Sequence, residues 1–257
     1  MARVLGEFIL IRRFLFLFLL VPVCYAADST INALDTPEKA VEQALRYTGF
    51  EERLKDKSIL DDAAGLAKKV LIEVDSTPFL RDQIEGREMW MVRFIDVDIR
   101  TEFKINLGVP PEYRSFTVVL DPAKGWLARV FSDPVRDRPD LLPKPSGEVA
   151  EKKIHFGAGE VWHEFPDSLP GINFIQALDA SPACFPIMAN EISGHYVIFS
   201  DNLLKQMPIW HVMVRGIMSP IRQEYRPDGN YKLCGRCAVD AVTGEPMFST
   251  SAPTADE

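Results

Sequence analysis

The sequence predicts an α+β fold built from two tandem units, each with a helix packed on a small antiparallel sheet. Two observations predict it: a capped helix followed by alternating strands, and a set of short segments that occur twice in the same order. With 47% hydrophobic residues, the 257-residue chain has enough apolar side chains to form such a core.

The first helix is predicted to begin after Thr36 and to end at Gly49. Thr36 places a capping hydroxyl before Pro37, and proline is favoured at the first helical position. Glycine is the commonest residue just after a helix end. One apolar face is then formed by Ala40, Val41, Ala44 and Leu45.

A second helix is predicted over 61–74, where small and apolar residues recur at the spacing of a buried stripe. Ser76-Thr77-Pro78 then breaks the pattern.

Three strands are predicted next, over 89–99, 115–120 and 126–131. The first alternates in part, with Trp90, Val92 and Phe94 on one face. Asp121-Pro122-Ala123-Lys124-Gly125 has the composition of a turn and predicts that the last two strands form a hairpin.

Three segments of the second half match the first half in the same order. Gln176-Ala177-Leu178 repeats Gln43-Ala44-Leu45, 210–215 resembles 90–93, and Asp240 to Gly244 matches the turn at an offset of 119 residues. Chance similarity among hairpins is the alternative interpretation. Repetition of an α+β unit of about 100 residues is the favoured one.

The predicted organisation follows from this repeat and from a proline-rich stretch after Asp133. It comprises a signal peptide at 1–26, a first unit at 27–133, a linker or bridge at 134–166, a second unit at 167–250 and a disordered tail at 251–257.

Residues 1–26 have the features of a cleaved secretory signal. Arg3, Arg12 and Arg13 precede an apolar run, and Cys24-Tyr25-Ala26 places small residues at the positions that a signal peptidase recognises. An uncleaved anchor and a lipoprotein signal are the less favoured alternatives. The expected location is the periplasm or the exterior, where disulfides are permitted.

The charge of the mature chain argues against nucleic-acid binding. Three of the 29 basic residues and one of the 37 acidic residues lie in 1–26, so cleavage leaves a net charge of about −10. Nucleic-acid affinity comes largely from Lys and Arg side chains that neutralise phosphates. No later stretch has the roughly 20 apolar residues of a membrane helix, so an integral membrane protein is not expected after cleavage.

The order of helix, Trp-containing strand and strand ending in Asp-x-x-x-Gly is similar to the PepSY family of exported domains. Residues 239–245 resemble the signature of that family's final hairpin, and 119–125 resemble it less. The resemblance implies a cystatin-like helix on an antiparallel sheet and a link to peptide binding or peptidase inhibition. The family has no catalytic set, so the resemblance implies no site residues.

Three cysteines remain after cleavage, namely Cys184, Cys234 and Cys237. At the offset of 119, Cys237 corresponds to Val118 on the apolar face of its strand and is predicted to point inward. A Cys184–Cys237 disulfide is the first prediction, and a tight Cys234–Cys237 loop is the second.

A redox dithiol in Cys234-Gly235-Arg236-Cys237 is less favoured, because a strand follows where the redox motif needs a helix. A zinc site completed by Cys184 and a histidine is less favoured still.

The remaining candidate site residues are also predicted to have structural roles. His155, Glu160, His163 and Glu164 lie close in sequence, but Gly157 and Gly159 argue against the helix that a metal site would need. His195 is expected in a turn beside Gly194, and His211 on a sheet surface. Trp90 and Trp210 are expected in the core, with Arg93 and Arg215 in cross-strand ion pairs. No catalytic, cofactor-binding or metal-binding residue is predicted.

Two functions are consistent with this sequence. The favoured one is a non-catalytic exported module that binds a peptide or protein, in the manner of a peptidase inhibitor or by strand addition at a sheet edge. The alternative is a thiol-redox or metal-binding protein that uses Cys234 and Cys237.

Overall fold

The computed structural model describes residues 33–72, 86–133, 161–181, 187–200, 206–218 and 232–253. The helical elements are α1 (Pro37–Thr48), η1 (Phe50–Arg53), η2 (Lys57–Asp61), α2 (Ala63–Leu66), α4 (Glu102–Asn106) and α5 (Phe174–Asp179). The strands are β1 (Ala67–Leu71), β2 (Glu88–Asp98), β3 (Tyr113–Leu120), β4 (Leu127–Ser132), β5 (Val161–Glu164), β6 (Ile187–Ser200), β7 (Gln206–Met218), β8 (Lys232–Asp240) and β9 (Pro246–Pro253).

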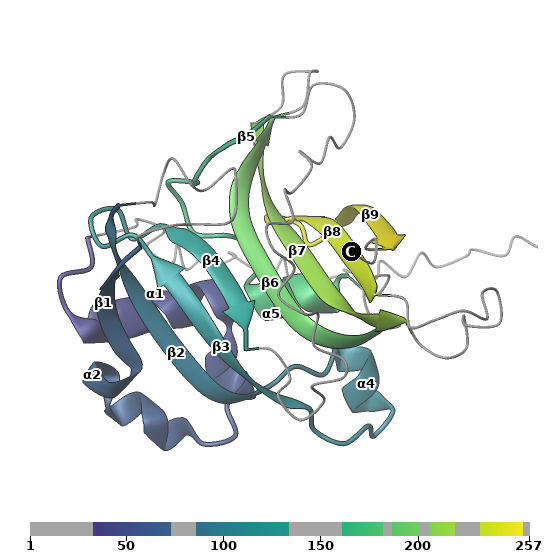
Figure 1. Ribbon diagram of the computed structural model, residues 1–257, viewed down its shortest axis with the longest axis horizontal. Coiled ribbons are helices and arrows are strands. Elements are labelled where there is room, and N and C mark those ends of the chain that lie inside the picture. The colour runs from purple at the N-terminus through teal and green to yellow at the C-terminus, as the bar shows by residue number, and fades with distance from the viewer. Residues whose placement is uncertain are drawn as a thin grey trace, which may run out of the picture.

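The described strands form one nine-stranded antiparallel sheet in the order β1-β2-β3-β4-β6-β7-β8-β9, with β5 added to β6 (Figure 1). The junction between the two halves is short, because β4 meets β6 through only two residue pairs, Val130–Gly194 and Phe131–Ser193. By contrast, the β6–β7 ladder extends from Ile187–Met218 to Ser200–Gln206.

The prediction of two units, each with its own small sheet, is therefore wrong. Pairing of β4 with β6 joins all described strands into one sheet, and the described helices are few and short. The physical reason is that two separate sheets would leave two further strand edges with unpaired backbone groups, and joining them removes both edges.

The helices α1 and α5 lie on the same face of this sheet (Figure 1) and share one hydrophobic core with it. Phe174 of α5 packs directly over Gly194 at the junction. A Cβ atom at position 194 would overlap the Phe174 ring, so this close approach requires glycine. The junction therefore depends on side-chain packing as well as on its two strand pairs.

The opposite face of the sheet has two smaller apolar clusters. The first contains Met89, Val119, Ala128 and Phe165, and the second contains Val197, Phe199, Ile209 and Ala238. Both faces of the sheet therefore bury apolar side chains.

The first predicted helix is confirmed. The Thr36 hydroxyl accepts a hydrogen bond from Lys39 N, Pro37 is the first helical residue, and Gly49 ends α1 with a φ of 72°. The second predicted helix, over 61–74, is wrong. It is replaced by the single turn α2 and then by β1, whose residues pair with β2 from Ala67–Val92 to Leu71–Glu88. Ser76 to Pro78 lie outside the described residues.

The three predicted strands and the turn between the last two are confirmed as β2, β3 and β4 with an intervening Asp121 turn. Asp121 Oδ1 accepts hydrogen bonds from Ala123 N and Lys124 N at 2.8 and 2.9 Å, and Gly125 has a φ of 70°.

The same turn geometry recurs between β8 and β9. Asp240 Oδ1 accepts from Val242 N and Thr243 N at 2.7 and 3.0 Å, and Gly244 has a φ of 78°. The backbone N–H of each turn glycine also bonds the carbonyl of its aspartate. The origin of the two halves as a sequence repeat stays a prediction.

The two predicted core tryptophans are confirmed and have matching hydrogen bonds. Trp90 and Trp210 are 5% and 0% exposed. Trp90 Nε1 donates to Leu34 O at 2.9 Å, and Trp210 Nε1 donates to Ile172 O at 2.8 Å. Each indole therefore fastens the segment before a helix to the sheet.

Several predicted boundaries lie outside the described residues, including the signal at 1–26 and most of the linker. The described end of that linker forms β5, which pairs with β6. The predicted tail differs from the structure, because β9 continues through Pro253.

None of the described helices has the length and apolar character required to cross a membrane.

Candidate functional site

The two ends of the sheet differ in their chemistry. Among the described strands, β1 and β9 each have only one neighbour, β2 and β8 respectively. The β1 edge has two lysines, Lys68 and Lys69, whereas residues 247–252 of β9 include no charged residue. Lysines on an edge strand oppose pairing with another chain, so β9 is the less protected edge.

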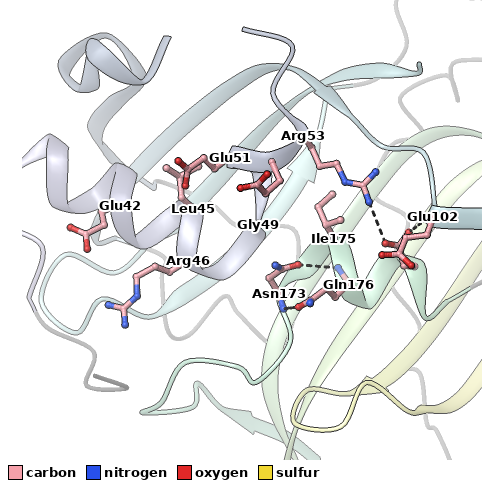
Figure 2. A pocket seen from close by; sticks show the side chains of 12 residues that line it. Glu42, Leu45, Arg46, Gly49, Glu51, Arg53, Glu102, Asn173, Ile175 and Gln176 are labelled. Atoms are coloured by element: carbon pink, nitrogen blue, oxygen red, sulfur yellow. Dashed lines mark hydrogen bonds and ion pairs between the residues drawn. The ribbon is translucent and has the colours of Figure 1, made fainter. Parts of the chain in front are cut away.

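A cleft of about 420 Å³ lies on the helix face, where α1, η1, α4 and α5 meet (Figure 2). Its lining residues are Glu42, Leu45, Arg46, Gly49, Glu51, Glu52, Arg53, Glu102, Asn173, Ile175, Gln176 and Asp179. These residues come from three distant parts of the sequence, which the fold brings to one place.

An ion pair joins η1 to α5 at the end of the cleft. Arg53 Nη2 lies 3.4 Å from Asp179 Oδ2, with the two side chains 14% and 18% exposed. Arg53 Nη1 also donates to Arg100 O at 2.9 Å, and Glu102 N donates to Asp179 Oδ1 at 3.0 Å. The Asp179 carboxylate therefore binds both η1 and the start of α4.

Burial raises the pKa of Asp179 above its usual value. The backbone N–H of Glu102 and the charge of Arg53 act in the opposite direction, but burial is the larger effect. A half-buried carboxyl group whose charge is incompletely compensated, located in a cleft, is typical of binding sites.

The wall opposite Arg53 is fixed by a capping box at the start of α5. Asn173 Oδ1 accepts from Gln176 N at 2.9 Å, and Gln176 Oε1 accepts from Asn173 N at 2.8 Å (Figure 2). Gly49 lies against the Asn173 amide, and both its positive φ and this close contact exclude a Cβ atom.

Arg53, Glu102 and Asp179 were not identified from the sequence, because no motif links three residues so far apart. The Asn-x-x-Gln spacing of the capping box is a local signal that could have placed the start of α5.

The predicted cysteine sites are described only in part. Cys237 lies in β8 opposite Val212 and is 1% exposed within the main core, which confirms its predicted inward orientation. Cys234 is in the same regular strand, opposite Arg215. Three strand steps separate the Cα atoms by about 10 Å. A disulfide needs less than about 7 Å, so the strand geometry does not favour a Cys234–Cys237 loop or a redox dithiol.

We expect non-reduced peptide mass spectrometry to find a Cys184–Cys237 disulfide. Cys184 itself lies outside the described residues, but α5 ends five residues before it and packs in the same core as Cys237. An unpaired Cys184 in protein purified without reductant would contradict this expectation.

The structure differs from the sequence predictions for the two described histidines. His195 is in the middle of β6, not in a turn, and His211 is buried in β7, not at a sheet surface. They are paired in register, with their rings stacked at a centroid distance of 6.3 Å. His195 Nδ1 lies 3.3 Å from Ala128 O of β4, so this pair is located beside the junction of the two halves.

The other predicted residues give no further site. His155 and Glu160 lie outside the described residues, and His163 and Glu164 are within β5. Arg93 forms the predicted type of contact, an ion pair, with Asp133 just after β4. Within the described residues, no group of three or more His, Cys, Asp or Glu side chains could hold a metal ion.

Comparison of the chain with family models, curated proteins and solved structures finds no match in any of the three. The PepSY resemblance therefore stays a prediction, and the candidate sites must be judged by their own geometry.

Proposed function

We propose that this protein is an exported, non-catalytic module that binds an extended segment of a peptide or protein by adding it as a strand to β9. The observation on which this proposal rests is the uncharged edge at residues 247–252. Strand addition obtains affinity from main-chain hydrogen bonds and specificity from alternate side chains.

The eight residues of β9 are long enough for this mode of binding. Their ladder with β8 extends from Leu233–Pro253 to Val239–Pro246, with an irregularity only at the Ala238/Val239 end. In an antiparallel strand, backbone groups point alternately to the two sides. In the described structure, the backbone groups of β9 that point away from β8 are therefore available to form hydrogen bonds with a peptide segment of about six residues.

The opposite edge supports this choice by contrast. In β1, Lys69 lies over the Trp90 ring at 5.2 Å from its centroid, and the neighbouring Lys68 is exposed. A partner strand at β1 would have to desolvate these ammonium groups, whereas β9 has no such obstacle. No described observation favours the alternative function in thiol-redox or metal chemistry.

We expect lysines on β9 to weaken peptide binding by about tenfold. The probe is an eight-residue peptide selected from a phage-displayed library on the purified protein. The test variant is Met247→Lys/Ser251→Lys, and the matched control is Val70→Lys/Leu71→Lys, which adds the same charge to exposed positions of β1. Calorimetry measures the affinity, and hydrogen exchange measures the protection of β9 amides.

Methylation of alternate backbone nitrogens in the selected peptide should abolish binding in one register and leave it intact in the other, because only one set of N–H groups faces β9. Equal loss in the β1 and β9 variants, or binding without protection of β9 amides, would contradict the proposal. Failure to enrich any peptide would contradict it as well.

A further inference from the structure

The hairpin of β3 and β4 matches the hairpin of β8 and β9 residue for residue. Register pairs of the first hairpin reappear in the second when 119 is added to both residue numbers. The pairs are Phe116–Ser132, Val118–Val130 and Leu120–Leu127 in the first hairpin, and Gly235–Ser251, Cys237–Ser249 and Val239–Pro246 in the second. Both ladders have a register irregularity just before the last of these pairs. By register, β9 is therefore the counterpart of β4.

The outer edge of β4 shows how a strand of this kind receives another strand. There β6 runs antiparallel to β4, and Gly194 pairs with Val130. Two residues earlier in β6, the backbone N–H of Ile192 donates to Ser132 Oγ at 2.9 Å. Ser132 is 1% exposed, so this hydrogen bond is buried. Its hydroxyl therefore provides β6 with an acceptor beyond the last backbone pair of the ladder.

The strand β9 has a serine at the same register position, because Ser251 corresponds to Ser132. The other serine of β9, Ser249, corresponds to Val130, which has no hydroxyl. Among the described strands, β9 has no neighbour on its outer side. Of the two serines, only Ser251 therefore has a counterpart whose side chain binds an incoming strand.

We propose that a segment bound at β9 runs antiparallel to this strand and donates a backbone N–H to the Ser251 hydroxyl, as Ile192 donates to Ser132. This inference rests on the proposed strand addition at β9 and specifies its direction and one of its contacts. The donor is the residue two positions before the one that pairs with Ser249. Proline has no backbone N–H, so the site selects against proline at the donor position.

Two serine variants test the contact, with the phage-selected peptide as the probe and calorimetry as the measurement. Ser251→Ala should raise the Kd about three- to tenfold, the usual effect of losing one hydrogen bond. Ser249→Ala is the matched control, because it removes a hydroxyl from the same strand, and it should leave the Kd unchanged. Equal changes in the two variants would overturn the assignment of Ser251.

Ester replacements in the peptide distinguish a direct contact from a distortion of β9. Each backbone N–H of the peptide is replaced in turn by an ester oxygen, which removes one donor. One replacement should weaken binding to the parent protein and to Ser249→Ala but not to Ser251→Ala, because the last variant already lacks the acceptor. If every ester weakens binding to Ser251→Ala as much as to the parent protein, the hydroxyl accepts no bond from the peptide and the proposal fails.

A nitroxide label on one end of the peptide reports the direction of the bound segment. At the peptide N-terminus it should broaden the NMR signal of the Ala252 amide more than that of Met247, and at the C-terminus the order should reverse. The opposite pattern means a parallel segment and would overturn the inference. A peptide that protects β9 amides but fails these tests leaves strand addition intact, whereas absence of any such peptide overturns both proposals.

Discussion

Replacement of Phe50 by alanine should lower the free energy of unfolding by about 3–5 kcal/mol, the usual cost of deleting a fully buried phenylalanine ring. Phe50 is 0% exposed, and its ring contacts three other phenylalanines. The centroid distances are 4.9 Å to Phe116, 5.6 Å to Phe94 and 6.1 Å to Phe174. The ring therefore joins η1 to two strands and to α5, and its removal leaves a cavity among elements from both halves.

Urea unfolding followed by fluorescence measures this loss of stability. Leu107→Ala is the control, because Leu107 is 66% exposed, and its truncation should change stability by less than about 0.5 kcal/mol. A loss below about 1.5 kcal/mol for the Phe50 variant would mean that the surrounding rings close the cavity. It would contradict the central position that we assign to Phe50.

Local signals predicted α1, because everything that defines it lies within fourteen residues. The Thr36 cap, Pro37 and the Gly49 end are all adjacent to the helix that they limit. The 61–74 segment was predicted wrongly for the converse reason. Its helical spacing is local, but residues 67–71 obtain backbone partners from β2, and this long-range pairing prevails over a weak helical preference.

Glycine misled the prediction for His195. Gly194 suggested a turn, but in the structure it is a strand residue whose missing side chain makes room for Phe174. The need for glycine at position 194 arises from a helix about twenty residues earlier in the chain. No local pattern encodes such a contact, so the position of His195 could not be read from its neighbours.

The same limit applies to the candidate cleft. Arg53, Glu102 and Asp179 are each ordinary charged residues in their own segments, and only the joining of the two halves into one sheet brings them together. The β9 edge is the opposite case, because its uncharged run is visible in the sequence. However, the position of β9 at the end of the sheet follows only from the strand order in the structure.

Acid should destabilise the protein through His211 in particular. Burial, together with the smaller effects of the neighbouring His195 and Arg236, lowers the pKa of His211 to about 3. In the unfolded chain the imidazole has its ordinary pKa of about 6.5. Below that pH the unfolded state binds a proton that the folded state does not, so stability falls as the pH decreases from about 6.5 towards 3.

The expected contribution of His211 is a loss of about 3 kcal/mol between pH 7 and pH 4, out of a total that also includes the carboxylates. His211→Gln removes the titrating group and should reduce the slope of stability against pH by about one proton over this range. Urea unfolding at pH 7, 6, 5 and 4 compares the two proteins. NMR of the imidazole protons gives an independent measurement, because the His211 signals should not titrate between pH 8 and 4.5. A midpoint near 6.5, or identical slopes for the two proteins, would show that the folded protein accepts this proton and would contradict the prediction.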